Sequence, residues 1–115
     1  MGTMLVARCD CGYMHGPIMQ GGGFATFTTQ DMEPAYCERC REMVVLNYMA
    51  KRPRCPRCGG RPVFYNDPSL RRAPEDDTPQ RLVSRWGEFV LPDTEYRCPQ
   101  CGEMRMRFED CGTWD

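Results

Sequence analysis

The residues best suited to chemistry in this chain are its cysteines, because eight of the nine lie in close pairs. Three pairs have two residues between the thiols: Cys37 and Cys40, Cys55 and Cys58, and Cys98 and Cys101. Two thiolates at this spacing can point at one metal ion from a single tight turn. Gly59 and Gly102, each directly after a pair, suit the left-handed backbone that such a turn often needs. Three such pairs in 115 residues strongly indicate metal binding.

The fourth pair, Cys9 and Cys11 in ARCDCGY, has only one residue between its thiols and is either a half-site or an accident. An internal repeat favours a half-site. The segment YCERCREMVVLNY aligns with YRCPQCGEMRMRFED, so that its two cysteines match Cys98 and Cys101. Each copy would close a unit that an upstream pair opens, and CDCG lies where the first copy needs that pair. We therefore interpret CDCG as a shortened half-site.

The repeat also predicts how the pairs combine into sites. In chain order, Cys9, Cys11, Cys37 and Cys40 form one site, and Cys55, Cys58, Cys98 and Cys101 form the other. The alternative is an interleaved pairing, because about 14 residues separate 37–40 from 55–58, which is a common spacing within one site. That alternative joins 9–11 to 98–101 across the ends of the chain. Either way, four thiolates make a closed structural site, so we expect two zinc ions per chain.

Two further residues lie near these pairs in the sequence. Cys111 is left over by either pairing, and we interpret it as a small buried hydrophobic residue near the C-terminus. His15 could displace a cysteine at the first site, although a surface histidine is the simpler interpretation.

The elements that must position the cysteines are short strands. Residues 104–108 alternate apolar side chains with arginine, which is the period of a half-buried strand. Residues 24–29, 44–46 and 62–65 are further predicted strands, and no segment has a convincing helical period. Residues 66–81 are polar, contain three prolines and are predicted to form an exposed loop.

The composition favours a small fold that depends on metal. Hydrophobic residues make up 41% of the chain, but this figure includes nine cysteines and nine methionines. Aliphatic side chains for a core are therefore sparse, and units below about 70 residues usually rely on metals or disulfides. We expect a small metal-stabilised β fold with short β-hairpins and little helix.

These motifs resemble the zinc ribbon, in which two cysteine knuckles on β-hairpin turns clamp one zinc ion, and more broadly the rubredoxin-like group. The resemblance covers nearly the whole chain as two tandem zinc ribbons, residues 1–50 and 51–115, the second carrying the polar loop 66–81. CPRCGG and CPQCGE match the family's knuckle closely, whereas CERC has Arg41 in place of glycine and CDCG is one residue short. The chain also resembles small uncharacterised bacterial proteins with a GGGFATF segment and a C-terminal GTWD.

The resemblance implies two kinds of function. Zinc ribbons (a type of zinc finger) commonly serve as binding modules in transcription, translation and nucleic-acid-processing assemblies. Rubredoxins hold iron in the same tetrahedron and carry one electron. Thiolates accept both metals, so the ligands leave zinc and iron open.

The sequence argues against secretion, membrane insertion and catalysis. MGTMLVARCDC lacks the apolar stretch of a signal peptide, and no run approaches the roughly 18 apolar residues of a membrane span. We therefore expect a cytoplasmic protein, where thiols stay reduced and bind metal. With one histidine, no phosphate-binding loop and no nucleophile elbow, we expect neither an enzyme nor a small-molecule substrate.

Basic residues around the third cysteine pair form a candidate binding surface. They are Lys51, Arg52, Arg54, Arg57 and Arg61, with no acidic residue among them. Their charges could contact phosphates or an acidic protein, or they could simply offset the charge of a tetrathiolate site. A net charge of −1 argues against a non-specific nucleic-acid coat. We expect an adaptor that contacts a protein complex or nucleic acid; an iron electron carrier is the alternative.

Aromatic side chains admit two interpretations. The set is Phe24, Phe27, Tyr65, Trp86, Phe89 and Trp114. Exposed rings beside arginines could stack on single-stranded bases. We expect instead that most of these rings fill the small cores over the metal sites, because the chain has few aliphatic residues to do so.

Overall fold

The computed structural model describes residues 2–23, 28–73 and 81–114, and these residues are mostly β-structure. The strands are β1 (Gly2–Cys9), β2 (Met14–Gly21), β3 (Met32–Cys37), β4 (Glu42–Asn47), β5 (Val63–Phe64), β6 (Leu82–Trp86), β7 (Phe89–Pro92), β8 (Tyr96–Arg97) and β9 (Met104–Trp114). A short 3-10 helix, η1 (Pro68–Leu70), is the one helical segment in these three ranges. No helix in the described part of the chain is long and apolar enough to cross a membrane. The expected small β fold is confirmed.

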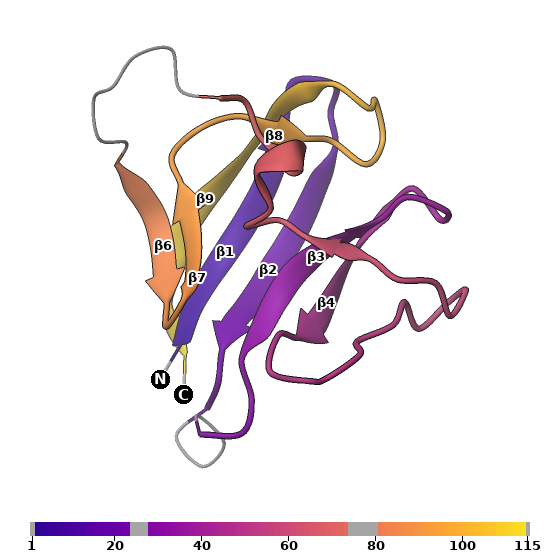
Figure 1. Ribbon diagram of the computed structural model, residues 1–115. Helices are drawn as coiled ribbons and strands as arrows, with labels where there is room; N and C mark the ends of the chain where they lie inside the picture. The colour runs from indigo at the N-terminus through magenta and orange to yellow at the C-terminus, as the bar shows by residue number, and fades with distance from the viewer. Residues whose placement is uncertain (1, 24–27, 74–80, 115) are drawn as a thin grey trace.

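The larger sheet joins the two ends of the chain (Figure 1). Its strands lie in the order β4-β3-β2-β1-β9-β8, and β5 also pairs with β3. β1 runs antiparallel to β9, with Gly2 opposite Trp114 and Cys9 opposite Met106. Met32 of β3 pairs with Gly21 of β2. Further along β3, Ala35 and Tyr36 pair with β5. The sheet therefore crosses residue 50, where the resemblance to tandem zinc ribbons placed the boundary between residues 1–50 and 51–115.

Aromatic rings dominate the core, which lies between the larger sheet and the β6–β7 hairpin and η1 in front of it (Figure 1). The rings of Tyr65, Tyr96 and Phe108 contact one another nearly edge to face, with centroids 5.0 to 6.1 Å apart. Phe89 on β7 packs against Tyr48 in the same way, at 5.1 Å. Such pairs add roughly 0.5–1.5 kcal/mol each beyond the area they bury. The rings thus add cohesion to a core that contains few aliphatic residues.

The candidate stacking aromatics divide between the core and the surface. Tyr65 and Phe89 are fully buried, which confirms their core placement. Trp86 and Trp114 are half-buried. Phe24 and Phe27 lie outside the described residues.

The predicted strands are largely present. Residues 104–108 form the first part of β9, where Met106 and Phe108 are buried and the alternating Arg105 and Arg107 are exposed. Residues 44–46 lie in β4, and β5 occupies the centre of 62–65. The strand expected at 24–29 lies mainly outside the described residues, and its last two positions form a turn. Within the polar segment 66–81, η1 interrupts the loop and 74–80 are not described.

Candidate metal centres

The structure gathers the eight paired cysteines into two groups of four. One group is Cys9, Cys11, Cys98 and Cys101; the other is Cys37, Cys40, Cys55 and Cys58. Within each group the four sulfur atoms all lie within 4.8 Å of one another. The interleaved pairing is therefore correct, and the pairing in chain order is wrong. The physical reason is strand pairing, because β1 lies beside β9 and β5 lies beside β3.

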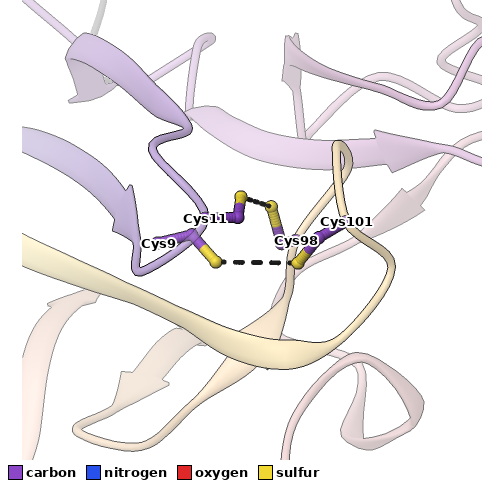
Figure 2. Close-up of side chains that lie close together, drawn as sticks. All are labelled: Cys9, Cys11, Cys98 and Cys101. Carbon is purple, nitrogen blue, oxygen red and sulfur yellow. Dashed lines mark hydrogen bonds between the residues drawn. The ribbon is translucent and has the colours of Figure 1, made fainter.

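Sulfur–sulfur distances in both groups suit one tetrahedral ion. In the first centre, Cys11 Sγ is 3.6 Å from Cys98 Sγ, and the Cys9 and Cys101 sulfurs are 3.7 Å apart (Figure 2). The two corresponding distances in the second centre are 3.5 and 3.9 Å. A metal–sulfur bond of about 2.3 Å places tetrahedral ligands about 3.8 Å apart. Each group could therefore hold one metal ion with little movement of the chain.

All four knuckles share one backbone feature. The residue directly after the second cysteine has a positive φ in each: Gly12 (99°), Arg41 (52°), Gly59 (71°) and Gly102 (74°). This left-handed region is open to glycine and costs most other residues about 1–2 kcal/mol. Arg41 is the one non-glycine residue with positive φ in the described part of the chain. The CERC knuckle thus has a positive φ at the same position as the other three knuckles, without a glycine there.

Backbone hydrogen bonds show that CDCG is a complete but shorter knuckle. In CPRCGG, Gly59 N–H donates to Cys55 O, and Cys55 N–H donates back to Gly60 O, both at 2.9 Å. In CDCG, Gly12 N–H donates to Cys9 O, and Cys9 N–H donates to the carbonyl of the residue after Gly12, both at 3.0 Å. The same two bonds therefore close the turn one residue earlier. The geometry agrees with a half-site and not with an accidental pair.

The metal-free thiols differ in acidity because their surroundings differ. A hydrogen bond from the backbone of Tyr13 lowers the pKa of Cys11 to about 7. Backbone hydrogen bonds at its own knuckle, from Cys58 first, lower the pKa of Cys55 to about 7. Burial raises the pKa of Cys98 to about 12. Each centre thus contains one thiol that ionises easily, whereas a fully ionised set of four needs a cation among the sulfurs.

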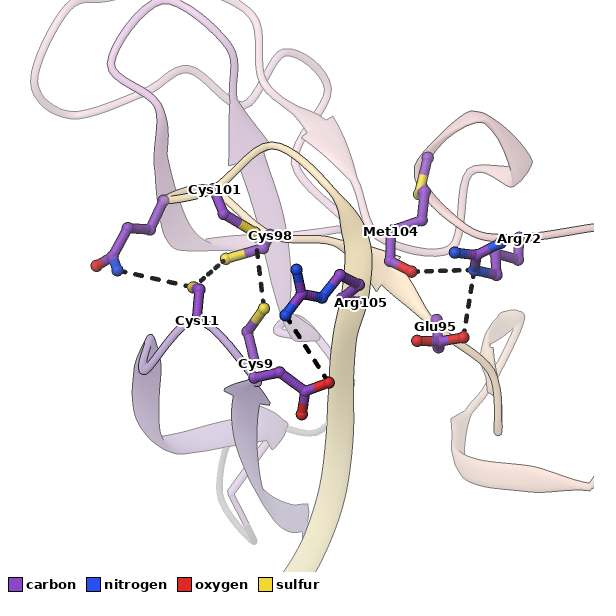
Figure 3. A network of polar contacts seen from close by, with 10 residues as sticks. Cys9, Cys11, Arg72, Glu95, Cys98, Cys101, Met104 and Arg105 are labelled. Atoms are coloured by element: carbon purple, nitrogen blue, oxygen red, sulfur yellow. Dashed lines mark hydrogen bonds and ion pairs between the residues drawn. The ribbon is translucent and has the colours of Figure 1, made fainter.

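Groups outside the sulfur tetrahedra support both centres. Gly60 N–H points at Cys58 Sγ from 3.4 Å, and the Gln100 side-chain amide lies 3.7 Å from Cys11 Sγ. Near the first centre, Arg72 Nε donates to Met104 O at 3.0 Å and pairs with Glu95 at 3.2 Å (Figure 3). These contacts tie the segment after η1 to the start of β9, next to the knuckle that carries Cys98 and Cys101.

The two remaining candidate ligands lie outside both groups. Cys111 is exposed, with its Sγ donating to Met4 O at 3.3 Å, so its interpretation as a buried hydrophobic residue is wrong. It lies at the register shift in the pairing of β9 with β1, between Asp110, which is opposite Leu5, and Gly112, which is opposite Met4. His15 is half-buried on β2 opposite Ala7, and it belongs to neither cysteine group.

The basic residues of the candidate binding surface are all exposed. Two of them interact with the protein itself: Arg57 forms an ion pair with Glu42 at 2.5 Å, and Arg54 donates to Gly59 O at 3.1 Å. The other three, Lys51, Arg52 and Arg61, line a hollow of about 380 Å³ together with Pro53 and Pro62. We call these five basic residues, 51, 52, 54, 57 and 61, the basic surface.

Fold and site together define a small β protein with two four-cysteine sites that could hold metal. The sites fit those of zinc ribbons, because each joins a pair on a hairpin turn to a pair from a neighbouring element. Comparison with protein-family models, curated proteins and solved structures gave no match.

Proposed function

We propose that this chain is a non-enzymatic adaptor module, held together by two structural zinc ions, that contacts nucleic acid or a protein complex through its basic surface. The closed character of both cysteine groups is the observation that carries this proposal. Each group offers four cysteine sulfurs within 4.8 Å of one another, so an ion with all four as ligands would keep no open position for substrate or water. Zinc, when bound, supplies charge neutralisation and a crosslink, and no redox chemistry.

The crosslink would matter because each centre joins distant segments. The first joins the β1–β2 turn to the β8–β9 turn, and the second joins the β3–β4 turn to the segment before β5. Metal binding is then coupled to folding, as in other small domains whose ligands are scattered along the chain. A rigid platform of this kind suits recognition by surface groups.

The basic surface supports the adaptor proposal. Lys51, Arg52 and Arg61 line one hollow, and no acidic residue is among the five that line it. None of the three forms an ion pair in the described residues, so each charge is available to a phosphate or carboxylate. Arg57 is less available because Glu42 holds it.

Charge reversal tests the surface directly. The triple variant Lys51→Glu, Arg52→Glu, Arg61→Glu should keep two zinc ions and native melting, because all three side chains are exposed. It should weaken binding to a labelled oligonucleotide or a polyglutamate peptide by at least about tenfold at low salt. The matched control reverses three exposed arginines elsewhere, Arg81, Arg85 and Arg107. Equal losses in both variants, or no binding of either probe to the wild type, would remove the basic surface from the proposal.

An iron-containing electron carrier is the second candidate. It is favoured by N–H groups that approach the sulfurs at Gly60 and Gln100, because such contacts tune the potential of iron–thiolate centres. Protein purified without added metal distinguishes the two functions. Iron with thiolate-to-metal absorption in the visible range supports the carrier, and a colourless protein with two zinc ions supports the adaptor.

A further inference from the structure

A second polar cluster lies at the opposite end of the sheet from the cysteines. Gln20 at the end of β2 and Glu33 near the start of β3 are both fully buried. Gln20 Nε2 donates to Glu33 Oε1 at 2.6 Å, and Ser84 Oγ on β6 donates to Gln20 Oε1. The neighbouring Asp31 is 6% exposed. Buried polar groups of this kind are costly unless they are paired, so the cluster needs a physical explanation.

Two carboxyl oxygens of the cluster have no hydrogen-bond partner in the described residues, Asp31 Oδ1 and Glu33 Oε2. Burial raises the pKa of both groups, and contact with Asp31 raises that of Glu33 further, to about 11. A proton on Glu33 reduces the cost of burying the two carboxyl groups, because neutral Glu33 can donate a hydrogen bond to the Asp31 carboxylate. Asp31 is then the member of the pair that carries the charge when it ionises, and the ion pairs of the described residues include none to it.

Asp31 also lines a cavity of about 480 Å³ between the end of β4 and the β6–β7 turn. The other lining residues are Tyr48, Met49, Trp86, Gly87 and Glu88. Two acidic and two aromatic side chains are therefore present, with no basic side chain among these six residues. The indole of Trp86 is held in place by Gly21, where an added Cβ would lie 2.7 Å from a ring atom.

We propose that this cavity binds an organic cation, an ammonium or guanidinium group, through the carboxylates of Asp31 and Glu88 and the rings of Trp86 and Tyr48. A cation beside Asp31 compensates the buried charge, and an indole attracts cations through its π face. The cavity volume lies within the usual range of ligand sites, about 300–1,000 Å³. A divalent metal ion fits less well, because it needs about six oxygen ligands and gains nothing from aromatic walls.

The cation could be an arginine or lysine side chain of a partner or a free small amine. N-acetyl-arginine amide and N-acetyl-lysine amide represent the first source, and putrescine represents the second. N-acetyl-citrulline amide is the matched neutral control, because it keeps the shape of arginine without the charge. Zinc-loaded protein carrying Trp114→Phe leaves Trp86 as the single tryptophan, so its fluorescence reports the cavity.

We expect saturable quenching or enhancement by at least one cation, with a dissociation constant of about 1 mM or tighter, and none by the citrulline compound. Tighter binding of the acylated amino acids would indicate that the ligand is a partner's side chain. Tighter binding of putrescine would indicate that it is a free amine. No saturable binding of any cation, or equal binding of the citrulline compound, would overturn the proposal.

Variants separate the charge effect from folding. Glu88→Gln changes an exposed residue and should weaken cation binding about fivefold to tenfold without changing the melting temperature. Asp31→Asn should abolish binding, with thermal melting to check that the variant folds. Glu103→Gln, an exposed acid at the other end of the sheet, is the control and should bind as the wild type does. Unchanged binding in Glu88→Gln and in folded Asp31→Asn would contradict the assignment.

Discussion

Cys11 Sγ and Cys98 Sγ lie 3.6 Å apart although 87 positions separate them along the chain. The antiparallel pairing of β1 with β9 brings these residues together, since it places Cys9 opposite Met106, just beyond the knuckle of Cys98. A metal ion bound here would crosslink the β1–β2 hairpin to the turn that precedes β9. The first centre therefore closes a long loop, whereas the second joins segments much closer in sequence.

Removing one ligand should cost the protein one metal ion and much of its stability. Cys98→Ser should reduce zinc from two ions per chain to one, because a buried member of the first tetrahedron is lost. The free energy of unfolding should fall by several kcal/mol, since structural zinc contributes on the order of 10 kcal/mol. Cys111→Ser is the control, because Cys111 is exposed and outside both groups. Elemental analysis and thermal melting of both variants test this, and two zinc ions in Cys98→Ser would contradict it.

Arg41→Gly should stabilise the protein by up to about 1 kcal/mol, because glycine adopts φ of 52° without the penalty that arginine incurs. Gly102→Ala should have the opposite effect at the matching position of the other copy. A Cβ there meets no atom within 4 Å, so its cost is that of the backbone alone. Chemical denaturation measures both changes. A loss of stability in Arg41→Gly similar to that in Gly102→Ala would contradict the prediction.

Glu33→Gln should flatten the dependence of stability on pH. Burial, with the contact to Asp31, raises the pKa of Glu33 to about 11, so the native state keeps a proton that the unfolded chain releases above about pH 4.5. The contribution of Glu33 to the free energy of unfolding is full below about pH 4.5 and decreases as the pH rises toward about 11. Glutamine at position 33 can accept a hydrogen bond from Gln20 and donate one to Asp31, as neutral Glu33 can, but it does not titrate.

Denaturation of Glu33→Gln and wild type at several pH values above neutrality measures this slope. Glu109→Gln is the control, because the Glu109 side chain is 59% exposed and should leave the slope unchanged. The same slope in Glu33→Gln and the wild type would show that Glu33 does not hold its proton in the folded protein.

Local features of the fold could be predicted from the sequence. The alternation at 104–108 indicated a strand because one face of β9 is buried, and the knuckle motifs marked turns because their geometry is set within a few residues. The internal repeat also corresponds to a repeated local structure. Cys37 begins the turn of the β3–β4 hairpin, and Cys98 begins the turn of the β8–β9 hairpin.

The pairing of the knuckles could not be predicted from the repeat. It depends on which strands lie side by side, and the contact of β1 with β9 is a long-range feature that no local motif encodes. The spacing between Cys40 and Cys55 was the one sequence signal for the correct pairing. The buried pair Asp31 and Glu33 was missed, because charged residues in a sequence normally indicate surface.

Thiol labelling of a two-cysteine variant tests whether Cys9 and Cys11 share a metal ion with Cys98 and Cys101. In zinc-loaded Cys9→Ser/Cys11→Ser protein, treated with iodoacetamide and mapped by mass spectrometry, we predict alkylation of Cys98 and Cys101, which lose their partners. The other four paired cysteines should stay protected by the one zinc ion that remains, and Cys111 should react as an internal control because it is exposed. Alkylation of Cys37 and Cys40 with protection of Cys98 and Cys101 would contradict the account.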